Sequence, residues 1–126
     1  MKRERALRVV LVLVGLLFLA AVLPAVAGVL HPENSDTGDT MMMSLYATMG
    51  AFLLLAARNP SAYRALIAFT AWSSFAHAVV MSLLGLKMPR ERQGFLIGSA
   101  ILVVIGLALI ALAPAKRTEP SLVPGD

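Results

Sequence analysis

Long apolar segments alternate with short polar ones along most of this chain. Four segments are almost entirely apolar, at residues 6–29, 41–57, 65–86 and 94–113. Each is close to the roughly 20 residues that a helix needs to cross the ~30 Å hydrocarbon core of a bilayer. Because backbone groups in lipid must be hydrogen-bonded within their own segment, each segment is expected to be a helix. The pattern predicts an all-α protein, a four-helix transmembrane bundle.

The polar segments between these spans are too short to hold more than turns. Residues 30–40 carry acidic side chains and no Lys or Arg, and Thr37 or Asp39 is expected to cap the next helix. Neighbouring helices joined by such short loops run antiparallel, so the bundle is expected to go up, down, up and down. We expect one membrane domain over residues 1–114 and a disordered cytoplasmic tail over residues 115–126.

Composition and charge support this interpretation and add an orientation. Hydrophobic residues make up 59% of the chain and charged residues 14%, whereas soluble domains carry about 25% charged residues. Of the 11 Lys and Arg residues, Lys87, Arg90 and Arg92 lie in the third loop and the other eight at the two ends or in the second loop. Because cytoplasmic segments carry the excess of basic residues, both termini are expected in the cytoplasm. The net charge of +4 has the same explanation, so nucleic acid is not expected as a partner.

The first segment has two interpretations. Its basic head and its length favour a retained transmembrane helix, and Pro24 is expected to kink this helix near its outer end or to begin its exit from the membrane. The competing interpretation is a secretory signal peptide that ends with Ala-Val-Ala at residues 25–27, a small-x-small cleavage pattern. Residue 30 lies outside the cell in both cases, so the rest of the topology is unchanged.

The third segment carries a polar face. Its members are spaced i, i+3, i+4 and i+7, which places them on one side of a helix: Thr70, Ser73, Ser74 and His77. Ionisable side chains near mid-membrane are costly and often functional, which singles out His77. Because lipid does not accommodate a polar face, the other helices are expected to pack against it.

This face suggests a candidate ligand pocket. We expect Trp72 to join it from the third helix, and Ser44 and Thr48 from the second. His77 can bond a ligand, relay a proton or ligate a haem iron. It can equally be a neutral residue that bonds across the bundle to Ser44, Thr48 or Ser99 and holds the helices together. Trp72 lies too far inside its segment for an interfacial tryptophan, so it is expected to pack in the bundle or to line the cavity.

Several chemistries lack the residues that they need. The absence of cysteine excludes disulfides, thiolate metal sites and cysteine-ligated iron–sulfur clusters. The four segments contain no carboxylate for proton-coupled exchange, and His31 lies in a loop, which leaves His77 without a second membrane histidine for a haem. No zinc or di-iron ligand set, G-x-S-x-G sequence or phosphate loop occurs. We therefore assign no catalytic residue, metal or cofactor, and an enzyme is the less favoured class.

Two stretches resemble a known family. They are AARNPSAYR at residues 56–64 and FTAWSSFAH at residues 69–77. With the apolar run before them, they are similar to small bacterial four-helix membrane proteins known as a domain of unknown function, over roughly residues 3–113. This resemblance implies the four-helix fold and an inner-membrane location. A looser similarity, in helix layout, is to DoxX-like proteins and to scaffold proteins of sterol enzymes, which implies a redox-associated subunit or a non-catalytic organiser.

Three functions remain open from the sequence. The favoured one is a non-enzymatic inner-membrane helper, or a module that binds a lipid or another small molecule at the polar face. The second is a quinone-binding oxidoreductase subunit that holds its quinone through His77 and Trp72. The third is a small transporter built as a homodimer, in which helices meet at Gly94 and Gly98, because G-x-x-x-G spacing permits close approach.

Overall fold

The computed structural model describes residues 2–114, which form five α-helices and two short 3-10 helices. These are α1 (Lys2–Leu19), α2 (Val22–Leu30), η1 (Pro32–Asn34), α3 (Thr37–Ala56), η2 (Pro60–Tyr63), α4 (Arg64–Lys87) and α5 (Arg92–Leu112). The described residues contain no strand. Four segments are long and apolar enough to cross a membrane. They are α1 together with α2, then α3, then η2 together with α4, and finally α5. The prediction of an all-α protein with four spans is confirmed.

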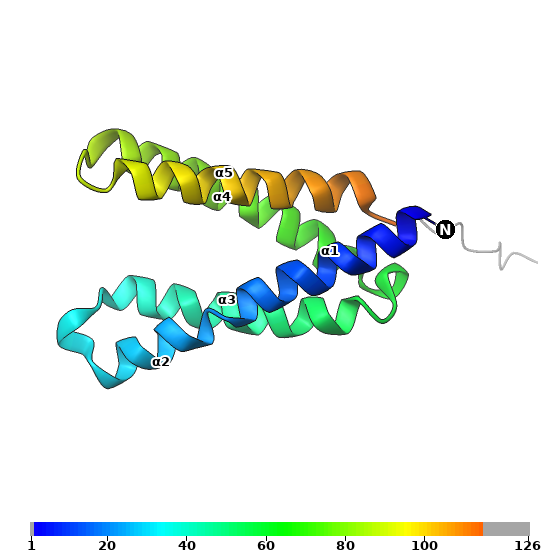
Figure 1. Cartoon of the computed structure of the whole chain (residues 1–126), viewed down its shortest axis with the longest axis horizontal. Helices are drawn as coiled ribbons and strands as arrows, with labels where there is room; N and C mark the ends of the chain where they lie inside the picture. The colour runs from blue at the N-terminus through cyan, green and yellow to red at the C-terminus, as the bar shows by residue number, and fades with distance from the viewer. Residues whose placement is uncertain (1, 115–126) are drawn as a thin grey trace, which may run out of the picture.

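The helices form two hairpins that meet at one end (Figure 1). α3 packs along α1 and α2, and α5 packs along α4. The hairpins lie together near the start of α1 and diverge toward their turns. We call the first the narrow end, which consists of the start of α1, residues 57–63 and the end of α5. The wide end consists of residues 31–36 and 88–91, so the bundle has the form of a V.

Glycines allow α1 and α2 to approach α3 closely. A methyl group on Gly50 would lie 2.6 Å from the carbonyl oxygen of Gly15 and closer still to the backbone of Leu19. A methyl group on Gly28 would overlap the side chain of Thr40. Small residues permit backbone contact of this kind, which is a main source of association between helices in lipid.

The hairpin of α4 and α5 combines a glycine contact with hydrogen bonds. Gly106 lies against the ring of Phe75. The Ser99 hydroxyl donates to the carbonyl oxygen of Ala78 at 3.0 Å and lies 2.7 Å from the Ser82 hydroxyl. Because a hydroxyl has one proton, Ser82 is the donor in the second bond. These bonds fix the register of the two helices.

All four spans meet in one hydrophobic core, which extends from the narrow end to about the middle of the spans. One cluster of buried side chains joins α1, α3, α4 and α5: Leu7, Leu11, Val14, Phe18, Leu53, Ala56, Ile67, Ala71, Ala78, Leu102, Ile105 and Leu109. Two arginines add polar contacts at the narrow end. Arg3 donates to the carbonyl oxygen of Ala113 at 2.9 Å, and Arg64 donates to that of Pro114 at 2.8 Å. Both cations thus lie at the C-terminus of α5, where the helix dipole favours positive charge.

The first span is interrupted between α1 and α2. Pro24 has no N–H, and its ring clashes with the carbonyl group of the residue four positions earlier, Ala20. The backbone tightens there: the Ala21 N–H donates to Phe18 at 3.0 Å, and the Leu23 N–H donates to Ala20 at 3.1 Å. The predicted kink is confirmed, and it lies one turn ahead of the proline.

The start of α3 differs from the expectation. The helix begins at Thr37 rather than at residue 41, and Asp36 caps it by accepting the N–H of Asp39 at 3.1 Å. The expected cap, Thr37 or Asp39, is wrong, because both residues belong to the first helical turn and a cap precedes the N–H groups that it satisfies. The predicted tail, residues 115–126, lies outside the described residues.

We expect Gly50→Ala to loosen the contact between α1 and α3. The added methyl group would meet backbone atoms, which cannot rotate away as a side chain can. Overpacking of this kind costs about 1–3 kcal/mol, so thermal unfolding in detergent should have a lower midpoint. Gly94→Ala is the matched control, because a methyl group there meets nothing within 4 Å. If both variants melt with the wild type, the close contact does not exist.

Candidate functional site

A groove lies between α3 and α4 near the middle of the spans, where the two hairpins begin to diverge. Its volume is about 380 Å³, within the roughly 300–1,000 Å³ of typical small-molecule sites. Each helix contributes a stripe of side chains at helical spacing: Met42, Leu45, Tyr46 and Met49 from α3, and Phe69, Ser73, Ala76, His77 and Val80 from α4. The groove thus lies between two of the four candidate membrane spans, at mid-length.

His77 and Tyr46 form the polar centre of this groove. Their rings meet edge to face across it, with centroids 5.4 Å apart. Tyr46 also packs edge-on against Phe18 of α1, at 4.9 Å between centroids, which holds its ring in place. Within residues 2–114, no hydrogen bond to another protein group uses the imidazole of His77 or the hydroxyl of Tyr46. Both groups can therefore bond a molecule in the groove.

The polar face of α4 divides into two pairs. Thr70 and Ser74 are 0% and 1% exposed and lie in the packed interior, as expected, whereas Ser73 and His77 are half-buried and line the groove. The hydroxyls bond within α4. Thr70 donates to the carbonyl oxygen of Leu66 at 2.8 Å, and Ser73 and Ser74 donate to that of Thr70 at 3.2 and 2.7 Å. Such bonds need no neighbouring helix, which leaves His77 as the member of this face with unused bonding capacity.

The structure does not bring the other candidate residues into the groove. Trp72 is 65% exposed, and its ring packs against Phe75 at 5.5 Å between centroids. The expectation that Trp72 packs in the bundle or lines the cavity is wrong, because position 72 lies on the outer side of α4. Ser44 and Thr48 are exposed on α3 and donate to carbonyl oxygens of their own helix, those of Met41 at 2.6 Å and Ser44 at 3.0 Å.

The structural alternative for His77 is a hydrogen bond across the bundle. In the part of the chain that the structure describes, none of Ser44, Thr48 and Ser99 bonds to it. Ser99 donates instead to Ala78, within the hairpin of α4 and α5. The position of His77 is thus set by its packing against Tyr46.

Tyr46 is the site residue that the sequence reasoning missed. It is an aromatic residue with a polar tip inside an otherwise apolar segment, and Met42, Leu45 and Met49 share its helix face at positions i, i+3, i+4 and i+7. That combination was the available signal. The thioethers of Met42 and Met49 are flexible, so this wall can adapt to ligands of irregular shape.

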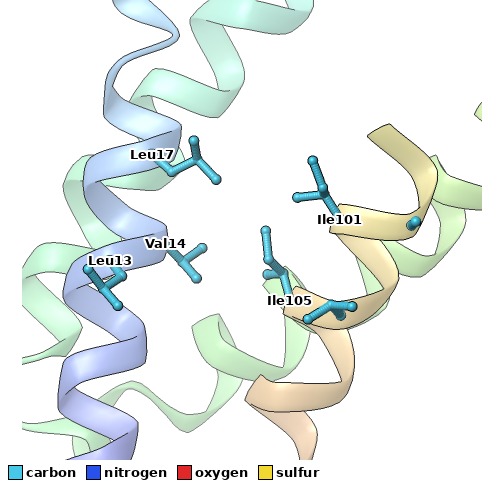
Figure 2. A pocket seen from close by; sticks show the side chains of 7 residues that line it. Leu13, Val14, Leu17, Ile101 and Ile105 are labelled. Carbon is cyan, nitrogen blue, oxygen red and sulfur yellow. The ribbon is translucent and has the colours of Figure 1, made fainter. Parts of the chain in front are cut away.

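A second groove lies between α1 and α5 (Figure 2). Its volume is about 360 Å³. Its lining is wholly aliphatic and comes from two faces that point toward each other: Leu13, Val14, Leu17, Ala100, Ile101, Val104 and Ile105. Such a surface can pack against hydrocarbon chains but offers no polar group that could recognise a head group.

The two glycines considered for a dimer contact face different surroundings. A methyl group on Gly98 would meet Met81 of α4, so this position serves the packing of α4 against α5. A methyl group on Gly94 would meet nothing within 4 Å. Of the pair, Gly94 is the one that leaves room for a second copy of the chain.

Comparison with known families assigns the chain to one of them. The sequence pattern of a family of unknown function (DUF6632) matches residues 3–123. The chain belongs to this family. The resemblance to a family of unknown function is therefore confirmed. No curated protein and no solved structure matches the chain, so the looser likeness to DoxX-like proteins and sterol-enzyme scaffolds gains no support.

Trp72, the single tryptophan of this DUF6632 protein, tests which side of α4 faces lipid. We expect its fluorescence in vesicles to be quenched strongly by lipids brominated at the middle of their acyl chains. Iodide in the aqueous phase should quench it weakly, because the indole is exposed at a position inside the span. Vesicles of the same lipids without bromine are the control. An indole that resists the brominated lipids would contradict its placement on the outer side of the helix.

Proposed function

We propose that this protein is a non-enzymatic membrane module that binds a lipid or another small molecule from the bilayer in the groove between α3 and α4. The observation that carries the proposal is the pair of His77 and Tyr46, which have unused hydrogen-bonding capacity at mid-span. Polar groups without partners are costly in hydrocarbon. A molecule that bonds to the pair is therefore favoured in the groove over the hydrocarbon chains that surround it.

The composition of the groove favours binding over catalysis. Its lining includes no carboxylate, lysine or arginine, so its titratable side chains are His77 and Tyr46 alone. An activated nucleophile needs a base that a third group orients, but the lining offers no carboxylate to orient His77, and the Ser73 hydroxyl donates to the carbonyl oxygen of Thr70. A quinone is one candidate occupant, since its carbonyl oxygens accept hydrogen bonds. It would be held by His77 and Tyr46 rather than by His77 and Trp72, because Trp72 is exposed on the outer side of α4.

A filled groove is the test of this proposal. We expect gently purified protein to retain a small molecule, visible as an added mass in native mass spectrometry. Ala76→Trp should abolish the added mass, because Ala76 lines the groove and an indole there would fill it. Ala68→Trp is the matched control, since Ala68 is exposed on the same helix and does not line the groove. A wild-type protein without an added mass, or an Ala76→Trp variant that keeps it, would refute the proposal.

The proposal includes an orientation, with both termini on the cytoplasmic side of a bacterial inner membrane. It is supported by the basic residues that cluster at the narrow end: Lys2, Arg3, Arg5, Arg8, Arg58 and Arg64. The wide end carries the acidic loop at residues 31–36. Positively charged segments are retained in the cytoplasm during insertion, so the four spans would cross the membrane up, down, up and down.

Reporter fusions measure this orientation. We expect a green fluorescent protein fused to the C-terminus to fluoresce, because it folds in the cytoplasm and not after export. An alkaline phosphatase fused after Arg90, in the turn between α4 and α5, should be active, since that enzyme needs the exported side. The opposite pair of results would show that the membrane orientation is reversed.

A further inference from the structure

We infer that the groove between α3 and α4 selects a neutral amphiphile, a largely hydrocarbon molecule whose single hydroxyl or carbonyl group bonds to His77 and Tyr46. The inference rests on the proposed binding function and names the class of ligand. Three features of the groove lead to it: its depth in the membrane, its lack of charge, and the arrangement of its hydrogen-bonding atoms.

The depth of His77 excludes a phospholipid head group as the recognised part. α4 begins at Arg64 and ends at Lys87, two charged residues that favour the membrane surfaces. At 1.5 Å per residue, His77 is about 20 Å from the first and about 15 Å from the second along the helix. The hydrocarbon core is ~30 Å thick, so the imidazole lies near its middle. A head group anchored at the surface does not reach it, whereas hydrocarbon does.

The lining of the groove excludes a charged ligand group. Its polar members are Tyr46, Ser73 and His77, and its other members are Met, Leu, Phe, Ala and Val. A phosphate, carboxylate or ammonium group at this depth would lose its hydration and find no oppositely charged side chain in the lining, which is costly. The group that enters must therefore be polar but neutral.

The hydrogen-bonding atoms of the groove suit one oxygen. An uncharged imidazole offers one donor and one acceptor, and the tyrosine hydroxyl both donates and accepts. Because the two rings are in edge-to-face contact, with centroids 5.4 Å apart, their polar atoms belong to the same part of the groove, beside which the oxygen of a ligand can lie. A carbonyl oxygen would accept from both, and a hydroxyl would donate to one and accept from the other. Ser73 already donates to Thr70, so it can only accept.

The remaining walls are suited to a hydrocarbon skeleton. Leu45, Phe69 and Val80 present carbon atoms to the groove, and Met42 and Met49 provide flexible contact surface. A second polar group on the ligand would face this apolar wall without a partner. Since the groove lies between two candidate membrane spans, a chain longer than the groove can extend into the bilayer. Long-chain and isoprenoid alcohols and ketones have this combination of features.

Photoaffinity labelling of the full chain in lipid nanodiscs tests the class of ligand. Three probes would share one alkyl chain with a diazirine and an alkyne, and would end in a primary alcohol, a methyl ketone or a phosphocholine. We expect the alcohol and ketone probes to label peptides of α3 and α4, and excess unlabelled farnesol to compete. The phosphocholine probe should label without competition, as bulk lipid does.

Variants then separate recognition from simple contact. Loss of one hydrogen bond weakens binding by about 2–10-fold, so competed labelling should fall by that factor in Tyr46→Phe. This variant keeps the ring contact with Phe18. Tyr63→Phe is the matched control, because it removes the same atom from an exposed residue in η2. His77→Phe should lower the labelling as well.

The outcomes distinguish the class of ligand from the binding function. If the phosphocholine probe is competed like the others, and Tyr46→Phe labels as the wild type does, the class is wrong and a binding module for lipids in general stands. If no probe shows competed labelling of α3 or α4, and Ala76→Trp changes nothing, both the class and the proposed function fail.

Discussion

The groove depends on where the two hairpins touch. The shared core joins all four spans, and at the narrow end Arg3 and Arg64 bond to the carbonyl groups that follow α5. Beyond this contact the hairpins diverge (Figure 1), so α3 and α4 no longer cover each other. A bundle packed along its whole length would have buried the facing sides of Tyr46 and His77. The divergence instead leaves both rings at the edge of an open space.

Two kinds of contact hold the molecule together, and they differ in stiffness. Within the hairpins, Gly50 and Gly106 bring helices so close that even a methyl group does not fit. Between the hairpins, most of the contact is made by larger aliphatic side chains, beside the Arg3 hydrogen bond and the contact of Tyr46 with His77, and lipid chains are as apolar as the aliphatic residues. We therefore expect each hairpin to behave as a rigid unit. The angle between the two hairpins should change more easily than the packing within each of them. This angle sets the width of both grooves.

The sequence was sufficient to predict the features that the bilayer imposes on any membrane-spanning chain. Hydrocarbon fixes the length and composition of a span, and local chemistry fixes the kink before Pro24. The sequence was not sufficient to predict how each helix is rotated about its own axis, and so which side chains face its neighbours. The position of Trp72 in the sequence correctly places it inside the span. Packing between neighbouring helices decides that Trp72 faces outward and that Tyr46 lies opposite His77. A pairing between residues on two helices cannot be read from either helix alone.

Polar side chains in a span differ in what they require from the rest of the protein. Serine and threonine hydroxyls can bond to the preceding turn of their own helix, as Thr70, Ser73 and Ser74 do. These residues are therefore tolerated in lipid without any further role. A ring carries its polar atoms away from its own backbone, so His77 and Tyr46 need partners from elsewhere. Both lie where the hairpins separate, and the geometry that leaves them without a hydrogen-bond partner among residues 2–114 also provides the space for a bound molecule.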